Sequence, residues 1–381
     1  MRSLLAGLLV ALLMGAAWGT PVAQCNFEEG ITGWTGLRLT LPGPGGGQPG
    51  FAEAPAQSVT EPANVKSGQR SLGLGFTPEP GVIYALGGSE LKVAGAQSLR
   101  MWAKSTTGSL CMLSLREADG SDYQATVMLL PDQWQEIRLN LSDLALGDDS
   151  QDENGTLDAD QVNGLGLVDA AGLLGMMVLQ QPLFEINLAP RSLYVDDVVF
   201  DSEETDGLIK RRAAGGGQEV VLGDFEGPTL TWAYIGTGNV DLLQDPKLAG
   251  GGTGCLQVSF DLTAGKLGLL INGLMKAARL TNAQALRFKA KCSVDCPLLV
   301  QIEEKGGGKY NKPVELKAGD VWTQVELPFA QFQPSDDSKD NNGRLDLDQA
   351  KSVLLMNLTA AANNAPFQGV LWLDDVAVLV Q

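Results

Sequence analysis

An acidic stretch that occurs twice constrains the fold of this chain more than any other feature. The first copy, DDSQDENGTLDADQ, spans residues 148–161, and the second, DDSKDNNGRLDLDQ, spans residues 336–349. Ten positions are identical between them at a constant offset of 188 residues. A repeat with so long a period indicates one module used twice, each copy large enough to bury its own core.

Other landmarks recur in the same order on both sides of the acidic stretch. The first copy opens with NFE at 26–28 and the second with DFE at 224–226, and each has a Trp seven residues after the Phe. The copies close on SLYVDDVVF and VLWLDDVAVL. Between them lies a charged and then Gly-rich segment, as is typical of linkers. We therefore predict a first module at 20–200, a linker at 201–218 and a second module at 219–381.

Short segments with alternating apolar residues fill each copy. SLGLGF at 71–76 corresponds to CLQVSF at 255–260, and SLRMWAKS at 98–105 corresponds to ALRFKAKC at 285–292. Alternation with a period of two is typical of half-buried strands, and glycine-containing turns between such segments favour hairpins. We predict an all-β chain of two tandem antiparallel β-sandwiches, with one closing strand after each acidic stretch, at 192–200 and at 370–379. The Gly/Pro-rich segment 40–57 has no counterpart in the second copy and is predicted to be a long surface loop.

The charge and the residue types exclude several classes of function. The net charge of −18 disfavours nucleic acid as a partner, because phosphates need clustered Lys and Arg. The chain contains no histidine, which excludes Ser-His-Asp and Cys-His nucleophile systems and HExxH zinc sites. Catalysis would then need paired carboxylates, such as Glu117 with Asp119, but the second copy has Gly306 where Asp119 stands. We predict a protein that is not an enzyme.

The N-terminus resembles a secretory signal. Met1-Arg2 precedes the apolar run SLLAGLLVALLMGAAW, and Ala17-Trp18-Gly19 fits a small-x-small cleavage site. We expect residues 1–19 to be removed and the protein to be secreted, extracellular or periplasmic. An alternative is a lipid anchor at Cys25, although a bulky Gln precedes that cysteine. No later segment has the ~20 apolar residues of a membrane span.

Five cysteines occur in this exported chain. Cys292 and Cys296 are predicted to form a disulfide if they flank a turn. A disulfide between Cys25 and Cys111 is also possible, and Cys255 would then remain unpaired.

The acidic stretch itself has two compatible interpretations. With Gly155 at the sixth position of a calcium loop, oxygen ligands would come from Asp152, Asn154 and Asp158, and in the second copy from Asp340, Asn342 and Asp346. The twelfth position is Gln in both copies, where an EF-hand needs a bidentate Glu. Alternatively, Asn154-Gly155 forms a turn, and Asp158 with Gln161 forms a capping box at a short helical turn.

Together these motifs resemble a known family. The opening FE with its Trp, the alternating strands, the D-x-NG-x-LD loop and the closing (Y/W)-(V/L)-DDV look like a carbohydrate-binding module of the galactose-binding-like jelly-roll type. The pattern is similar to the family-eleven glucan-binding modules and their relatives, and it covers both copies. The resemblance therefore implies that both β-sandwiches are of the galactose-binding-like jelly-roll type.

The resemblance implies a structural calcium held by the opening Glu and a closing Asp. These residues would be Glu28 with Asp196 or Asp197, and Glu226 with Asp374 or Asp375. A cation there would relieve the repulsion between clustered carboxylates. Alternatively, Glu28 caps a loop and Asp197 faces solvent.

The resemblance also implies sugar binding by aromatic faces flanked by hydrogen-bonding side chains. We expect Trp102, Arg116 and Tyr123 to act in the first copy and Tyr310 in the second. The Trp residues at 34, 134, 232 and 322 occupy repeated positions and are expected to be structural.

Two functions are compatible with these observations. The first is a secreted, non-catalytic protein that binds a polysaccharide or cell-surface glycan and is stabilised by calcium. The alternative is a cell-envelope or extracellular structural or protein-interaction protein that keeps the fold and has no glycan ligand. An exposed Trp102 would favour the first function, and a buried one the second.

Overall fold

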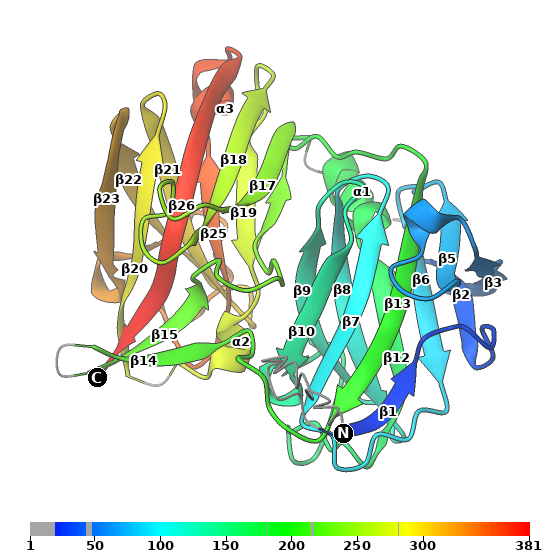
Figure 1. Ribbon diagram of the computed structural model, residues 1–381. Helices are drawn as coiled ribbons and strands as arrows, with labels where there is room; N and C mark the ends of the chain where they lie inside the picture. Colours follow the sequence, from blue (N-terminus) through cyan, green and yellow to red (C-terminus); the bar gives the residue numbers. More distant parts are fainter. Residues whose placement is uncertain (1–19, 43–47, 181, 215–216, 281) are drawn as a thin grey trace, which may run out of the picture.

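The computed structural model describes residues 20–42, 48–180, 182–214, 217–280 and 282–381. The predicted signal segment, residues 1–19, lies outside these ranges. The described chain forms two β-sandwiches that lie side by side (Figure 1). Every ladder between named strands in both sandwiches is antiparallel, so the fold prediction is confirmed. No helix within the described ranges is long and apolar enough to cross a membrane.

The first sandwich packs a six-stranded sheet on a seven-stranded sheet. In the first sheet the order is β10-β7-β13-β5-β4, and β1 also pairs with β13. Its strands are β1 (Pro21–Cys25), β4 (Gln57–Val59), β5 (Ser71–Phe76), β7 (Ser98–Ser105), β10 (Gln135–Asn140) and β13 (Arg191–Asp201). In the second sheet the order is β11-β9-β8-β12-β6-β2-β3. Its strands are β2 (Trp34–Thr40), β3 (Gly50–Ala54), β6 (Val82–Ser89), β8 (Ser109–Glu117), β9 (Asp122–Leu129), β11 (Ala145–Leu146) and β12 (Val162–Asp169).

The second sandwich repeats this arrangement. One sheet has the order β14-β15-β26-β18-β17, with β20 beside β26 and β23 beside β20. Its strands are β14 (Lys210–Ala214), β15 (Gly217–Gly223), β17 (Gly238–Gln244), β18 (Gly254–Leu262), β20 (Ala283–Cys292), β23 (Gly319–Pro328) and β26 (Phe367–Val380). The other sheet has the order β16-β19-β25-β21-β22-β24. Its strands are β16 (Ala233–Ile235), β19 (Gly268–Asn272), β21 (Cys296–Glu304), β22 (Lys309–Leu316), β24 (Gln333–Pro334) and β25 (Ala350–Asn357).

The helices are few and short, as the sequence predicts. They are α1 (Ala171–Gln180), α2 (Met275–Ala278) and α3 (Thr359–Asn363), together with the 3₁₀ turns η1 (Pro62–Asn64), η2 (Leu141–Asp143) and η3 (Phe329–Gln331).

Alternation along the strands builds the core of each sandwich. On β8, Cys111, Leu113 and Leu115 are buried, while Met112 and Ser114 between them are half-buried on the outer face. Side chains of this kind from both sheets form one hydrophobic cluster in the first sandwich. β5 and β7 have the bounds that the sequence pattern predicts, because each has buried apolar residues at every second position. These residues are Leu72, Leu74 and Phe76 on β5, and Leu99, Met101 and Ala103 on β7.

Two differences from the predicted strands have physical reasons. The predicted surface loop 40–57 contains β3, which pairs with β2, and ends at the first residue of β4, which pairs with β5. Strands β12 and β25, which follow the acidic stretches, were not predicted. The sequence of β12, VNGLGLVD, places glycine on the outer face, and glycine weakens a strand pattern. β12 is nevertheless a central strand, paired with β6 and β8.

The predicted linker is ordered over its described residues. The buried Asp143 carboxylate accepts hydrogen bonds from the backbone N–H of Leu208 (2.7 Å) and Ile209 (3.3 Å), which holds this part of the linker on the first sandwich. The next residues form β14, which pairs with β15 of the second sandwich. The module boundaries themselves stay predictions.

The predicted disulfide is absent, and all five cysteines are free thiols. Cys292 ends β20 and Cys296 begins β21, so they do flank a turn. Each sulfur has another partner: the Cys292 thiol donates to the carbonyl of Lys317 (3.4 Å), and the Asn357 side-chain amide donates to Cys296 Sγ (3.5 Å).

The two sandwiches share an interface next to β16. The backbone N–H of Met128 donates to the carbonyl of Leu230 (2.8 Å), and that of Arg138 donates to Thr229 Oγ1 (2.8 Å). Met128 and Leu130 of the first sandwich belong to the hydrophobic cluster of the second. The two cores are therefore in direct contact.

Candidate binding and metal sites

Two carboxylates from opposite ends of the first module hold one turn between them. Glu28 Oε1 accepts the backbone N–H of Gln69 (2.7 Å) and Arg70 (3.0 Å), and Asp196 Oδ2 accepts those of Lys66 (2.9 Å) and Ser67 (3.1 Å). We name Glu28, Asp196 and Asp197 the first clamp. Burial raises the pKa of Asp196 to about 6, although its hydrogen bonds oppose the shift.

Gly68 at the tip of this turn is required by the clamp. Its φ is +63°, and a Cβ atom there would lie 2.2 Å from Glu28 Oε1. The sequence motifs of the opening Glu and the closing Asp pair therefore meet in space, as the resemblance implies.

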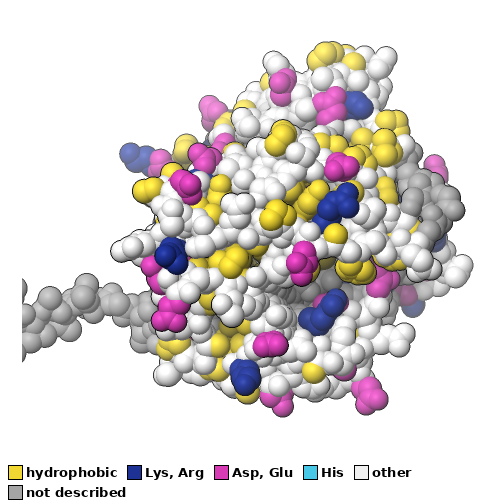
Figure 2. Space-filling model, turned by 90° about the vertical axis from the view of Figure 1, so that its right-hand side faces the viewer, with side chains coloured by type: hydrophobic (Ala, Val, Ile, Leu, Met, Phe, Trp, Pro, Cys, Tyr) yellow, Lys and Arg dark blue, Asp and Glu magenta, His cyan; other side chains and the backbone are white. Residues whose placement is uncertain are grey.

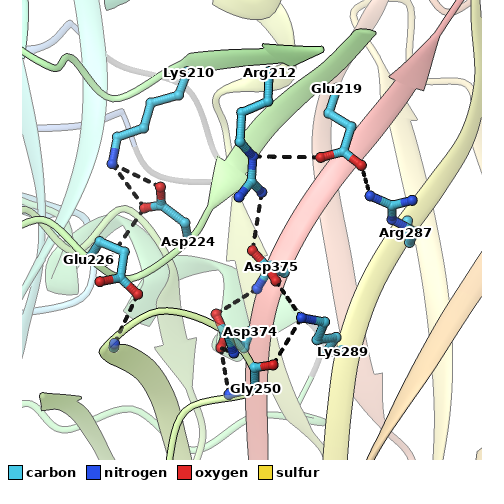
Figure 3. A network of polar contacts seen from close by, with 12 residues as sticks. Lys210, Arg212, Glu219, Asp224, Glu226, Gly250, Arg287, Lys289, Asp374 and Asp375 are labelled. Atoms are coloured by element: carbon cyan, nitrogen blue, oxygen red, sulfur yellow. Dashed lines mark hydrogen bonds and ion pairs between the residues drawn. The ribbon is translucent and has the colours of Figure 1, made fainter. Parts of the chain in front are cut away.

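The second module contains the same construction, which we name the second clamp (Glu226, Asp374 and Asp375; Figure 3). Glu226 Oε1 accepts the backbone N–H of Thr253 (2.8 Å) and Gly254 (3.0 Å). Asp374 Oδ2 accepts the N–H of Gly250 (2.7 Å) and Gly251 (2.9 Å). Both clamps thus close the module in the same way.

The second clamp differs from the first in holding a lysine. Lys289 Nζ donates to Asp375 Oδ2 (2.7 Å) and to the carbonyl of Gly250 (2.9 Å), as Figure 3 shows. Arg212 Nη2 also bonds Asp375 Oδ1 (3.1 Å). In the first module Trp102 stands at the matching position and pairs in register with Asp196. The lysine ammonium contacts a carboxylate and a carbonyl oxygen, which are ligands of the kind that calcium uses.

This difference decides how well calcium fits each clamp. The first clamp offers carboxylate oxygens, the type of ligand that a hard cation binds, and has Trp102 in place of the lysine. In the second clamp a calcium ion would have to displace the ammonium of Lys289. The residues of the second clamp therefore do not fit a calcium ion.

The acidic stretches fold into compact loops whose polar groups form hydrogen bonds within the loop and with a core tyrosine. Asp152 Oδ2 accepts the Tyr123 hydroxyl (2.6 Å) and the backbone N–H of Thr156 (3.1 Å). The Asn154 side-chain amide donates to Asp158 Oδ2 (2.9 Å). The second copy repeats these bonds through Tyr310, Asp340, Asn342, Arg344 and Asp346. The turn at Asn154-Gly155 is as predicted, but residues 158–161 form a hydrogen-bonded turn and no helix.

One group of three carboxylates does converge beside the first loop. Oxygens of Glu117, Asp119 and Asp152 lie within 4.8 Å of one another. Burial raises the pKa of Glu117, and Asp152 and Asp119 add to the rise. Glu117 also accepts the backbone N–H of Asp158, which fixes the loop on β8. The second copy has Gly306 in place of Asp119, so the full group belongs to the first module.

The structure does not bring the predicted sugar-binding residues together. Trp102 is half-buried on the outer face of β7, and Lys66 Nζ lies 3.7 Å from its ring centroid. Arg116, on the other sheet, is exposed and forms an ion pair with Asp122. Tyr123 and Tyr310 are each 1 % exposed, so the prediction that their rings stack on a sugar is wrong. Their rings fill the core, and their hydroxyls hold the acidic loops.

A row of aromatic side chains crosses the outer face of β23, β20 and β26. These residues were not predicted from the sequence as a binding site. Lys291 Nζ lies 5.0 Å from the Trp322 ring centroid and 5.2 Å from that of Trp372. The Trp372 indole N–H donates to Gln257 Oε1 (2.9 Å) on β18. The side chains of Trp322, Lys291, Trp372 and Gln257 are all half-buried. We name Trp322, Lys291 and Trp372 the second aromatic row.

The first module repeats the row with Trp134, Lys104 and Tyr194. Lys104 pairs in register with Tyr194, as Lys291 does with Trp372. Here the lysine is buried and bonds Asp132 Oδ1 (2.7 Å) and the carbonyl of Ala63 (3.0 Å). Of the four repeated Trp residues, Trp232 lies in the core of the second sandwich, and Trp34 packs against the core of the first. A comparison of the two copies could have found the rows, because aromatic residues recur on both sides of a recurring lysine.

Charge is spread thinly over the surface. Figure 2 shows one face of the molecule, on which acidic side chains stand singly among small groups of hydrophobic ones.

The fold and the clamps define a tandem β-sandwich similar to carbohydrate-binding modules. A family 11 module of a cellulosomal cellulase of Clostridium thermocellum is 20% identical over 45% of this chain and 97% of that chain, with a TM-score of 0.34. The N-terminal tandem CBM22 domain of Paenibacillus barcinonensis Xyn10C is 12% identical over 96% of this chain and 99% of that chain, with a TM-score of 0.32. A family 61 module solved with β-1,4-galactotriose is 12% identical over 47% and 94%, with a TM-score of 0.29.

No protein-family model matches the chain, and no curated protein sequence matches it.

Proposed function

We propose that the chain is an exported, non-catalytic protein that binds a polysaccharide or a cell-surface glycan. The observation that carries this proposal is the second aromatic row. Half-exposed indole rings offer an apolar face to the C–H side of a pyranose, and Lys291 and Gln257 offer hydrogen bonds beside it. The export rests on the apolar N-terminal segment of the sequence.

The geometry of the carboxylates supports a role without catalysis. Glycosidases place two carboxyl groups roughly 5–10 Å apart across an open cleft. Glu117 is 2 % exposed and is engaged by the backbone of Asp158, so it cannot face a substrate.

Binding assays on row variants test the glycan proposal. We expect one of a panel of soluble glucans, xylans and mannans to bind, and W372A and W322A each to weaken it about tenfold or more. W102A is a matched control, because it removes a half-buried Trp whose ring is covered by Lys66. If no glycan binds, or if both row variants bind as well as the wild type, the proposal is wrong.

We further propose that calcium stabilises the first clamp. Glu28 and Asp196 hold the same turn there, with Asp197 next to Asp196 in the chain, and a cation would relieve the repulsion between these carboxylates. Added calcium should raise the temperature of thermal unfolding, and EDTA should lower it, because a ligand that binds only the folded state stabilises it by mass action. An unfolding temperature that is the same in calcium and EDTA would contradict this part.

A second candidate function is protein interaction at the cell envelope or outside the cell. The observation that favours it is the exposure of Leu173, Met177 and Leu179 on α1, where Met177 is 53 % and Leu179 73 % exposed. If this helix is the functional surface, M177S/L179S should abolish retention on envelope preparations and leave glycan binding as it is. Retention that survives this change would exclude α1 as the interaction surface.

A further inference from the structure

A groove runs along the seam between the two sandwiches. One cavity of about 400 Å³ is lined by η2, the first acidic loop, the linker and α2, and a second of about 280 Å³ continues it. The two share lining residues from both modules, including Ser142, Leu144, Gly155, Ala277 and Arg279. We name them together the seam groove. Its size lies in the range of small-ligand sites, and neither module forms it alone.

The seam groove gathers positive charge in an acidic protein. Its walls carry Arg211, Lys276, Arg279 and Lys305, against the two carboxylates of Asp143 and Asp348. Asp143 is buried and accepts three backbone N–H groups, so it is not available to pair with these cations. Asp148 beside the groove has a lowered pKa, first through a hydrogen bond from Lys276, with Lys351 and Lys305 adding to the effect. The residues that line the seam groove therefore include more cationic than anionic side chains.

Two arginines in the groove are placed for binding a ligand. Arg211 Nη2 donates to the carbonyl of Ala278 at the end of α2 (2.8 Å), which fixes the guanidinium at the groove. Arg279 is exposed and forms no hydrogen bond or ion pair with the described part of the chain. Arg279 also has φ +49°, a left-handed conformation that Gly or Asn adopts more readily. An unpaired arginine at a strained position in a cavity indicates a functional reason for the residue.

The remaining surface of the groove suits a sugar. Leu144, Leu157 and Ile209 form an apolar floor, and Ser142 and Thr156 supply exposed hydroxyls. We propose that the seam groove binds anionic oligosaccharides, whose carboxylate or sulfate groups pair with Arg211 and Arg279. Guanidinium groups suit both anions because they donate two parallel hydrogen bonds. The inference rests on the proposed function in taking the ligand to be a saccharide, but it concerns a different surface.

Calorimetric titration with charged and uncharged forms of one oligosaccharide tests the proposal. The probes are oligogalacturonate, its fully methyl-esterified form and a sulfated oligosaccharide, each in calcium-free buffer. We expect the esterified form not to bind, and affinity for the anionic probe to fall as salt is added. The oligogalacturonate and sulfated arms show which anion the groove takes. If neither anionic probe binds, or if the methyl ester binds as well as the acid, the proposal is overturned.

Variants separate this groove from the aromatic row. R211Q and R279G should each weaken anionic binding about tenfold, and glycine at 279 fits the left-handed backbone, so the fold is retained. K317A is the matched control, since it removes an exposed lysine that pairs only with Asp295. W372A should leave anionic binding intact. If W372A loses neutral-glycan binding and keeps anionic binding, both sites are supported. If anionic binding survives in R211Q/R279G, the proposal for the seam groove is overturned.

Discussion

At the scale of single residues, the clamps repeat even their backbone strain. Phe27 and Phe225 have φ of +60° and +54°, and Asp197 and Asp375 both have φ of +48°. Non-glycine residues rarely adopt this region and keep it only where the surroundings enforce it. For Asp197 and Asp375 the enforcing feature is a bulge in β13 and β26. At this bulge the neighbouring strand on one side changes from β5 to β1 and from β18 to β15. What differs between the copies is the residue beside the clamp, which is Trp102 in the first module and Lys289 in the second.

Exchange of one residue should move the calcium site between modules. We expect W102K to lose one bound calcium per chain, because a lysine there supplies the charge that Lys289 supplies in the second clamp. K289M should gain one, since Asp375 then loses its ammonium partner. Calcium titration by calorimetry measures the stoichiometry directly. K291M, two residues along the same strand and outside the clamp, should keep the wild-type value, and an unchanged stoichiometry in both exchange variants would contradict the assignment.

The second clamp should also make stability depend on pH. Burial raises the pKa of Asp374 to about 6, above its ordinary value of 3.8. The folded state therefore holds this proton more tightly, and the free energy of unfolding falls as pH rises from about 4 to about 7. Burial alone would also raise the pKa of Asp375, but hydrogen bonds from Lys289 and Arg212 outweigh it and lower that pKa.

Denaturant unfolding at several pH values measures this dependence. D374N removes the titrating group, so the decline across that window should be reduced even though the variant is less stable overall. A decline of the same size in D374N would show that other groups cause it.

At the scale of elements, the linker is attached by one buried carboxylate. We expect D143A to cost about 1–3 kcal/mol of stability, because the N–H groups of Asn140, Leu208 and Ile209 lose their acceptor. The segment around residue 208 should then become sensitive to limited proteolysis. D206A removes a neighbouring carboxylate that accepts no hydrogen bond in the described chain, and it should leave the cleavage pattern unchanged. Equal protection of the segment in D143A and wild type would contradict this role.

The sequence could predict the elements whose own residues carry the signal. β5 and β7 alternate cleanly, and the carboxylates at the two ends of each module recur, so the sandwich and the clamp residues followed from pattern and resemblance. β12 was missed because its glycines hide the alternation that burial between β6 and β8 imposes. Tyr123 and Tyr310 were predicted to lie on the surface but lie in the core. The alternation along a strand does not show which of its two faces is buried, because that depends on the pairing register. The aromatic rows join three strands, which no local pattern reveals.

At the scale of the whole molecule, the two sandwiches should unfold as one unit. Leu230 is 2 % exposed, and its carbonyl accepts the N–H of Met128 where the cores touch. L230D places a charge in this contact and should split a single calorimetric transition into two. L248D, at a 39 % exposed position in the second module, is the control and should keep one transition. Two transitions in the wild type would mean that the shared contact does not couple the modules.

The pairing of β1 with β13 also sets how the first module responds to force. Pro21 lies opposite Asp201 and Cys25 opposite Val198, so the chain enters and leaves the module at the same end of one ladder. Tension between these two ends would break the hydrogen bonds of the ladder one pair at a time, in an unzipping geometry. The force needed to separate β1 from β13 would therefore be low. The opening would then reach Glu28 and Asp196, where two ends of the chain hold the same turn. When the chain is pulled at these two ends, the first clamp is therefore the first structure that resists unfolding.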